Sequence, residues 1–205
     1  MADHPTSLQG LTVLAIQHIE KREFAEAKKP LIKLIELYPE QIGDDCPYEL
    51  LAAIHKELKE TADERRVLEQ YAARTDSAVP SLLRLVELQS TAADWPTARE
   101  TVRQLLAINP LLPQIQRARA TIAEQLNETS EALTALEAML LMDPDDPAEL
   151  HFRLAKLLHQ QADPRAKSHV LQALEAAPRY RDAQKLLLKI VRAQKPEAKP
   201  EAKTP

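Results

Sequence analysis

Glycine is nearly absent from this chain: among 205 residues it occurs only as Gly10 and Gly43. Tight β-hairpin turns and phosphate-binding loops both rely on glycine, where φ is positive or a ligand approaches the backbone closely. Two isolated glycines cannot form a GxGxxG or a GxxxxGK[ST] motif. The low count therefore argues against a hairpin-rich β-fold and excludes nucleotide-binding loops built on these motifs.

Cysteine, aromatic residues and long apolar runs are scarce as well. Cys46 is the single cysteine and cannot form a disulfide within the chain. No apolar run approaches the ~18 residues of a membrane-spanning helix. The first ten residues lack the pattern of a secretory signal, so we expect a soluble, cytoplasmic protein, whether whole or part of a longer one. The net charge of −4 comes without a basic stripe, so we expect neither nucleic acid nor a membrane as partner.

The chain is rich in residues that favour helices, and it contains 15 prolines. An interval of 34 residues occurs twice in each of two series of positions: Pro110, Pro144 and Pro178, and Ala98, Ala132 and Ala166. A fixed period of this length indicates repeats of one supersecondary unit.

Each repeat is predicted to hold two amphipathic helices, because apolar residues recur at i, i+3, i+4 and i+7. Five such pairs precede a further helix over about 181–193, and Leu14 is placed on the apolar face of the first helix. A short insertion within 41–45 separates the first two repeats. Pro30 lies inside a predicted helix and should kink it or shorten its start. The chain thus divides into a disordered segment 1–7, a repeat domain 8–193 and a disordered Lys/Pro/Glu/Ala tail 194–205.

The period, the small residues at helix contacts and the proline that ends each unit resemble the tetratricopeptide repeat (TPR). The motif positions matched in the first and fifth repeats are Leu11, Leu14, Ala15, Ala27, Leu31 and Pro39, and Leu154, Ala155, Ala166, Val170 and Pro178. The resemblance covers about residues 8–193. It implies an all-α, right-handed α-solenoid of five helical hairpins plus a C-terminal capping helix, acting as a protein-binding scaffold.

A narrower resemblance leaves an alternative open. The run from Leu150 to Val191 looks like repeat domains at the C-termini of some bacterial zinc metallopeptidases. The catalytic HExxH motif does not occur in this chain. The alternative is therefore an accessory C-terminal repeat domain of a larger bacterial hydrolase.

Residues suited to catalysis or metal binding do not form a recognisable constellation. The sequence contains no GxSxG, HExxH or CxxC motif. We interpret His18 and His55 as packed, hydrogen-bonded histidines, and His151 and His159 as too far apart along one helix to share an ion. Cys46 stands at a helix start, where the dipole could lower its pKa, but we interpret it as a structural thiol. No enzymatic activity, cofactor or metal is expected.

The resemblance also implies a concave groove lined by the first helix of each repeat. Mapped onto this chain, the groove positions are Ile16, Ile19, Glu20, Glu49, Lys56, Leu83, Glu87, Arg117, Glu124, Phe152, Lys156 and His159. Acids outnumber bases among the groove positions, so the expected ligand is a neutral or basic peptide or protein segment. The alternative is a solvated face whose apolar members pack on neighbouring helices. A chaperone carboxylate clamp is not expected, because Ile16, Glu87 and Lys156 replace its asparagines; homo-oligomerisation is left open.

Overall fold

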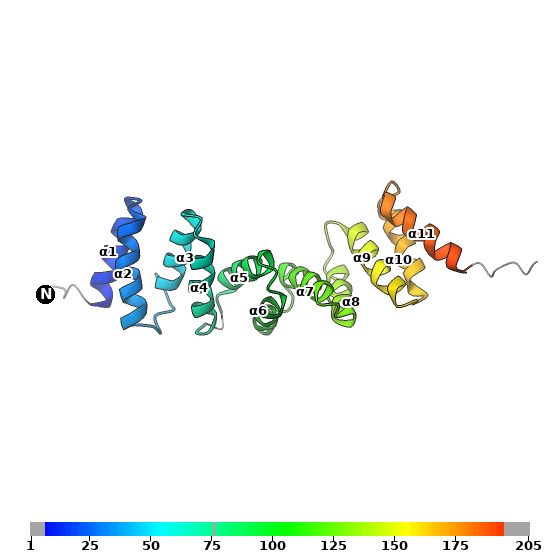
Figure 1. The fold of residues 1–205 in the computed structure, drawn as a ribbon. Helices are drawn as coiled ribbons and strands as arrows, with labels where there is room; N and C mark the ends of the chain where they lie inside the picture. The colour runs from blue at the N-terminus through cyan, green and yellow to red at the C-terminus, as the bar shows by residue number, and fades with distance from the viewer. Residues whose placement is uncertain (1–6, 76, 195–205) are drawn as a thin grey trace, which may run out of the picture. The chain divides into compact units, whose positions relative to one another are not determined.

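The computed structural model describes residues 7–75 and 77–194, which form helices and no strands (Figure 1). In chain order the helices are α1 (Leu8–Glu20), α2 (Phe24–Leu37), α3 (Pro47–Glu57), α4 (Thr61–Ala72), α5 (Val79–Thr91), α6 (Trp95–Ile108), α7 (Pro113–Gln125), α8 (Thr129–Leu140), α9 (Pro147–Gln160), α10 (Arg165–Ala176) and α11 (Arg181–Gln194). None of these helices combines the length and apolar character needed to cross a lipid bilayer.

Successive helices pair into five hairpins, from α1–α2 to α9–α10, and α11 packs against the last of them. Each hairpin also contacts the next one within its unit, through pairs such as α2 and α3 or α8 and α9. This arrangement confirms the predicted all-α helical-repeat solenoid; its right-handed sense stays a prediction. The segments predicted to be disordered lie almost entirely outside the described residues. Ser7 and Gln194 belong to the helical part, because Ser7 caps α1 and Gln194 ends α11.

The chain divides into two compact units, unit 1 over residues 1–110 and unit 2 over residues 111–205. Each unit has its own apolar core. In unit 1 the side chains of Leu31, Leu34 and Tyr48 are almost completely buried between hairpins. In unit 2, Leu154 on α9 and Val170 on α10 are the corresponding fully buried side chains. Both cores follow the i, i+3, i+4 spacing that the sequence shows.

Every hairpin turn contains one non-glycine residue in the left-handed region, with φ between 55 and 58°: Arg22, Lys59, Ala93, Asn127 and Ala162. The amide of the next residue donates to the carbonyl five positions earlier, at 2.8–2.9 Å. This bond satisfies a carbonyl that the helix end would leave unpaired. The next residue is acidic in all five turns: Glu23, Glu60, Asp94, Glu128 and Asp163. The hairpins are therefore closed without glycine, as the composition predicts.

Two details of the first hairpin differ from the sequence prediction. Helix α2 begins at Phe24 and runs through Pro30 to Leu37, so the prediction that Pro30 shortens the helix start is wrong. Proline removes an intrahelical hydrogen bond, and the Pro30 ring is buried on the inner face of this helix. Leu14 is 42 % exposed instead of buried. Its equivalents Leu51 and Leu85 follow another hairpin within unit 1 and are buried, whereas no described hairpin precedes α1.

The loop between α2 and α3, residues 38–46, is the longest connection within either unit. This confirms the insertion that the sequence places at 41–45. Gly43 lies in this loop without a positive φ, and a Cβ added there would meet nothing within 4 Å. The loop is held instead by Tyr48, whose hydroxyl donates to the carbonyl of Pro39 at 3.0 Å.

Candidate functional site

All twelve predicted groove residues lie on first helices, and none of them is a fully buried core residue. Seven belong to α1, α3 and α5 of unit 1, and five to α7 and α9 of unit 2. In unit 2 the structure gathers three of these residues around one pocket: Glu124, Phe152 and Lys156.

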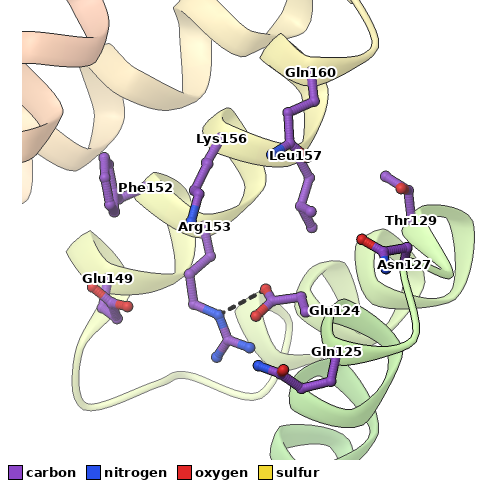
Figure 2. A pocket seen from close by; sticks show the side chains of 10 residues that line it. All are labelled: Glu124, Gln125, Asn127, Thr129, Glu149, Phe152, Arg153, Lys156, Leu157 and Gln160. Carbon is purple, nitrogen blue, oxygen red and sulfur yellow. Dashed lines mark hydrogen bonds and ion pairs between the residues drawn. The ribbon is translucent and has the colours of Figure 1, made fainter.

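The pocket lies between the α7–α8 turn and α9, and has a volume of about 340 Å³ (Figure 2). Its lining residues are Glu124, Gln125, Asn127, Thr129, Glu149, Phe152, Arg153, Lys156, Leu157 and Gln160. Phe152, Lys156 and Gln160 follow one another at helical spacing on α9, so one stripe of that helix faces the pocket. Leu157 is buried and supplies apolar surface.

An ion pair fixes one wall of the pocket. Arg153 Nε on α9 donates to Glu124 Oε1 on α7 at 3.0 Å (Figure 2). Both side chains are about three-quarters buried, so this pair neutralises a carboxylate that the sequence counted as a free groove charge. Arg153 itself was missed by the sequence analysis. Its helical position faces the preceding hairpin, and only the fold shows that α7 presents a carboxylate there.

An aromatic pair borders the same pocket. The rings of Phe152 and Tyr180 lie with their centroids 4.8 Å apart, tilted by 51°. The Tyr180 hydroxyl donates to Glu149 Oε2 at 2.5 Å. Burial, and next the bonded carboxylate, raise the pKa of Tyr180 well above its ordinary value, so the phenol stays protonated at neutral pH. Tyr180 was also missed, because it precedes the capping helix and belongs to no predicted groove position.

Four polar side chains at the pocket carry unused hydrogen-bonding capacity: Gln125, Asn127, Lys156 and Gln160. None of them bonds to another side chain or backbone group within residues 7–75 and 77–194. Gln125, Asn127 and Gln160 carry carboxamide groups, which both donate and accept hydrogen bonds. The pocket can therefore bond the N–H and C=O groups of an extended chain beside an apolar ring.

The remaining predicted residues of unit 2 lie elsewhere. Arg117 lines a hollow of about 310 Å³ together with Asp145 and Asp146. His159 lines another of about 300 Å³, formed with Pro164 and Ile190. Arg117, His159 and Phe152 thus line three different pockets. That they form one binding surface stays a prediction.

Several of the predicted groove residues of unit 1 contact other residues of the same unit. Glu49 Oε1 accepts from the Ser81 hydroxyl at 2.7 Å. Glu87 Oε2 accepts from Arg84 Nη1 at 3.0 Å. Arg84, like Arg153, was not counted in the predicted charge balance. Ile16, Ile19 and Leu83 are half-buried, and Ile19 packs on the core of this unit. The expected excess of acid is thus reduced wherever an arginine pairs with a groove carboxylate.

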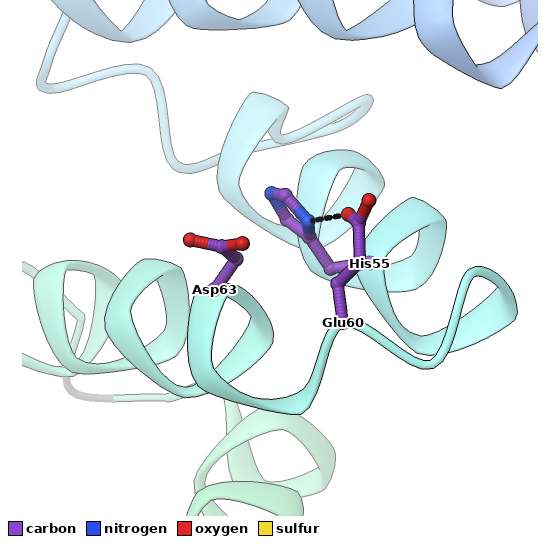
Figure 3. Close-up of side chains that lie close together, drawn as sticks. All are labelled: His55, Glu60 and Asp63. Atoms are coloured by element: carbon purple, nitrogen blue, oxygen red, sulfur yellow. Dashed lines mark hydrogen bonds and ion pairs between the residues drawn. The ribbon is translucent and has the colours of Figure 1, made fainter.

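One cluster has the composition of a metal site. The ligand atoms of His55, Glu60 and Asp63 lie within 4.8 Å of one another (Figure 3). Glu60 Oε2 accepts from His55 Nδ1 at 2.6 Å and also from the Lys28 ammonium. These two bonds lower the pKa of Glu60, Lys28 most. Asp63 is bonded to Arg66. Because the carboxylates already hold two cations of the chain, we assign no metal to this cluster.

His55 is buried and bonded, which confirms its interpretation as a packed histidine. His18 is half-buried and repeats the arrangement, with Nδ1 2.7 Å from Glu23 Oε2. Cys46 is buried at the start of α3, and desolvation raises the pKa of its thiol. The suggestion of a lowered pKa is therefore wrong, because burial outweighs the hydrogen bonds from the backbone at Glu49 and Tyr48, which lower it, and the structural interpretation of Cys46 stands.

Paired helices stacked through small and apolar residues, with a polar pocket on the first-helix face, define a helical-repeat fold of the tetratricopeptide type. Solved structures share this fold. YrrB, described as a TPR protein with an unusual peptide-binding site, is 12% identical with a TM-score of 0.66, covering 89% of this chain and 93% of its own. MamA is 12% identical with a TM-score of 0.62, covering 87% and 95%.

A tetratricopeptide repeat protein from Parabacteroides merdae is 14% identical with a TM-score of 0.52, covering 92% of this chain and 86% of its own. No protein-family model and no curated protein matches the sequence. At these identities the similarity establishes the fold, and the function has to be argued from the site.

Proposed function

We propose that the protein is a non-catalytic interaction module that binds a segment of a partner protein in the pocket of unit 2. The observation that carries this proposal is the pocket's composition: unengaged amide side chains beside the half-buried ring of Phe152. Amide side chains can bond the backbone of an extended peptide, and the neighbouring ring can contact one of its apolar side chains. YrrB, which shares the fold, has a peptide-binding site.

The ligand is an uncharged, extended segment with at least one apolar side chain. Gln125, Asn127 and Gln160 bond its backbone. The Lys156 ammonium donates to a further backbone carbonyl, and an apolar side chain rests on Phe152 and Leu157. The Glu124–Arg153 pair cancels its own charge, which leaves no net excess of acid at this wall. Burying one apolar side chain contributes about 2 kcal/mol, and each hydrogen bond about 1 kcal/mol. With four hydrogen bonds these contributions sum to about 6 kcal/mol, which corresponds to a dissociation constant of about 40 μM at best.

The state of the reactive side chains supports a non-catalytic role. The Cys46 thiol is buried and its pKa is raised, so it is a poor nucleophile. His55 is buried and bonded to Glu60. Neither group faces the pocket. Partner binding by the groove residues of unit 1, among them Ile16, Leu83 and Glu87, stays a prediction.

The other predictions about function stay predictions. Nothing in the structure favours the metallopeptidase alternative, and the sequence of the complete gene would decide it. Exclusion of nucleic acid and a cytoplasmic location also stay predictions, and homo-oligomerisation stays an open possibility. Light scattering over a range of concentrations would settle the last one.

Selection from a random peptide library, followed by fluorescence anisotropy with the selected peptide, tests the proposed function. We expect Phe152→Ala and Lys156→Glu each to weaken binding at least tenfold. Lys167→Glu is the matched control, because it makes the same charge change on an exposed position of α10. Circular dichroism checks that each variant is folded. If no peptide is selected, or if Phe152→Ala binds as the wild type does, the pocket is not the binding site.

A further inference from the structure

A pair of histidines lies inside the fifth hairpin and lines none of the three pockets described above. His151 on α9 and His169 on α10 face each other with their Nδ1 atoms 3.1 Å apart. The ring centroids are 5.3 Å apart and the ring planes are tilted by 33°. Both side chains are half-buried. Spacing along the sequence pairs His151 only with His159 on the same helix, and it is the fold that brings His169 next to His151.

The distance between the two Nδ1 atoms matches the spacing of two imidazole nitrogens that bind the same transition-metal ion. Metal–imidazole bonds are about 2.0–2.1 Å long. At angles between roughly 90° and 109°, two such bonds place their nitrogens about 2.9–3.4 Å apart. The observed 3.1 Å lies inside this range. We propose that His151 and His169 form a binding site for an imidazole-preferring divalent ion, with Zn²⁺ as the probe.

The chemistry of binding needs one tautomer change and no other reactant. Without the ion, one Nδ1–H donates to the other Nδ1. When the ion binds, that proton leaves Nδ1 and the same ring becomes protonated at Nε2. Both Nδ1 lone pairs then point to the ion. Since neither ring changes its charge, binding at neutral pH releases no net proton.

The surroundings keep both rings neutral, as ligation requires. Burial lowers the pKa of His151. Burial lowers the pKa of His169 as well, and the neighbouring His151 and Arg165 lower it further, against Glu137 and Asp163. Arg165 is itself paired with Asp163 at 2.9 Å and lies 3.7 Å from Glu137. The carboxylates therefore moderate the positive charge beside the pair.

Two features distinguish this pair from the His55 cluster. No lysine within residues 7–75 and 77–194 bonds to either imidazole, whereas Lys28 already bonds to Glu60 in the His55 cluster. Among the described residues no third His, Cys, Asp or Glu joins the pair within ligand distance. Water or a ligand carbonyl completes the coordination. Two imidazoles with open positions favour Cu²⁺, Ni²⁺ and Zn²⁺ over Mg²⁺ and Ca²⁺, which prefer oxygen.

Calorimetric titration of the full chain with zinc chloride at pH 7.5 tests the proposal. All proteins carry His4→Gln, which removes the histidine close to the chain's N-terminal amine. We expect one zinc ion per chain, at least tenfold weaker binding in His151→Gln and in His169→Gln, and no heat with magnesium. His55→Gln and His159→Gln are matched controls that should bind zinc as the His4→Gln parent does.

A second measurement keeps the test independent of zinc affinity and of folding defects in the variants. Electron paramagnetic resonance of the Cu²⁺-loaded His4→Gln chain should show two nitrogen ligands, and the further change His151→Gln should remove at least one. No binding at millimolar zinc, unchanged binding in His169→Gln, or loss of binding in His55→Gln would each overturn the assignment.

Discussion

Residues of the hairpin turns hold a backbone conformation that glycine would adopt without strain. Ala93 and Ala162 both have φ of 55°. A Cβ in this region costs about 1–2 kcal/mol, and glycine loses roughly 0.4–1 kcal/mol of stability through its greater freedom in the unfolded chain. We therefore expect Ala93→Gly to raise the free energy of unfolding by about 0.5–1 kcal/mol, measured by urea denaturation followed by circular dichroism.

The neighbouring residue gives a matched control for this prediction. Ala92 has φ of −80°, where alanine is unstrained. Ala92→Gly should therefore lower the free energy of unfolding by roughly 0.5 kcal/mol. The strain argument fails if both glycines destabilise the protein equally.

The histidine pair makes stability depend on pH in a defined direction. The pKa values of His151 and His169 are lower in the folded protein than the ~6.5 of an unfolded chain. The unfolded state thus binds protons more readily, so stability is complete above about pH 6.5 and decreases as the pH falls. We expect a lower urea midpoint at pH 5.5 than at pH 7.5, measured with a chelator present.

Replacing both rings tests the origin of this effect. The double variant His151→Leu/His169→Leu should show a flatter pH profile between pH 7.5 and 5.5. His159→Leu, on the same helix, serves as control and should keep the wild-type slope. A double variant with an unchanged slope would assign the pH dependence to other groups.

At the scale of the elements, an ion pair between a buried carboxylate and a partly exposed guanidinium joins the second and third hairpins. Glu64 on α4 is 2 % exposed, and its carboxylate accepts from Arg84 Nε and Nη2 on α5, at 2.7 and 3.0 Å. The bond to Glu64 is the main cause that raises the pKa of Arg84. Removing one partner leaves a buried charge uncompensated. We expect Arg84→Met to cost about 3 kcal/mol of unfolding free energy in urea denaturation.

Two further variants show whether burial is the reason. Glu64→Leu combined with Arg84→Met should recover most of the loss, because no charge then stays buried. Arg103→Met removes an exposed pair with Glu100 within α6 and should cost less than about 0.5 kcal/mol. Equal costs for Arg84→Met and Arg103→Met would contradict the argument.

The elements themselves were predictable because repeat period and apolar spacing are local properties of the sequence. Proline positions such as Pro47 and Pro113 coincide with the first residues of α3 and α7. The site was only partly predictable. Arg153, Tyr180 and His169 act through partners on other helices. Which side chains meet across a helix contact depends on rotation by a fraction of a turn, and the 34-residue period does not determine that rotation.

At the scale of the whole molecule, the solenoid is a series of hairpins whose contacts are close in sequence. Unit 2 has a continuous core that runs from Ala120 to Ile190, and α11 covers its last hairpin. In repeat proteins, stability is approximately the sum of repeat terms and nearest-neighbour interfaces. A fragment that keeps all interfaces of a unit should therefore fold without the other unit.

We expect the fragment 111–205 to retain the helical circular-dichroism signal of its share of the chain and to melt cooperatively. The matched control is the fragment 127–205, which lacks α7 and leaves α8 without its hairpin partner. Because Ala132 and Leu136 of α8 are completely buried, removing α7 exposes apolar surface that α9 alone does not cover. The shorter fragment should therefore lose helix well beyond the contribution of α7. If 111–205 proves unfolded while the full chain is folded, unit 2 depends on residues of unit 1, and its core is not sufficient for folding.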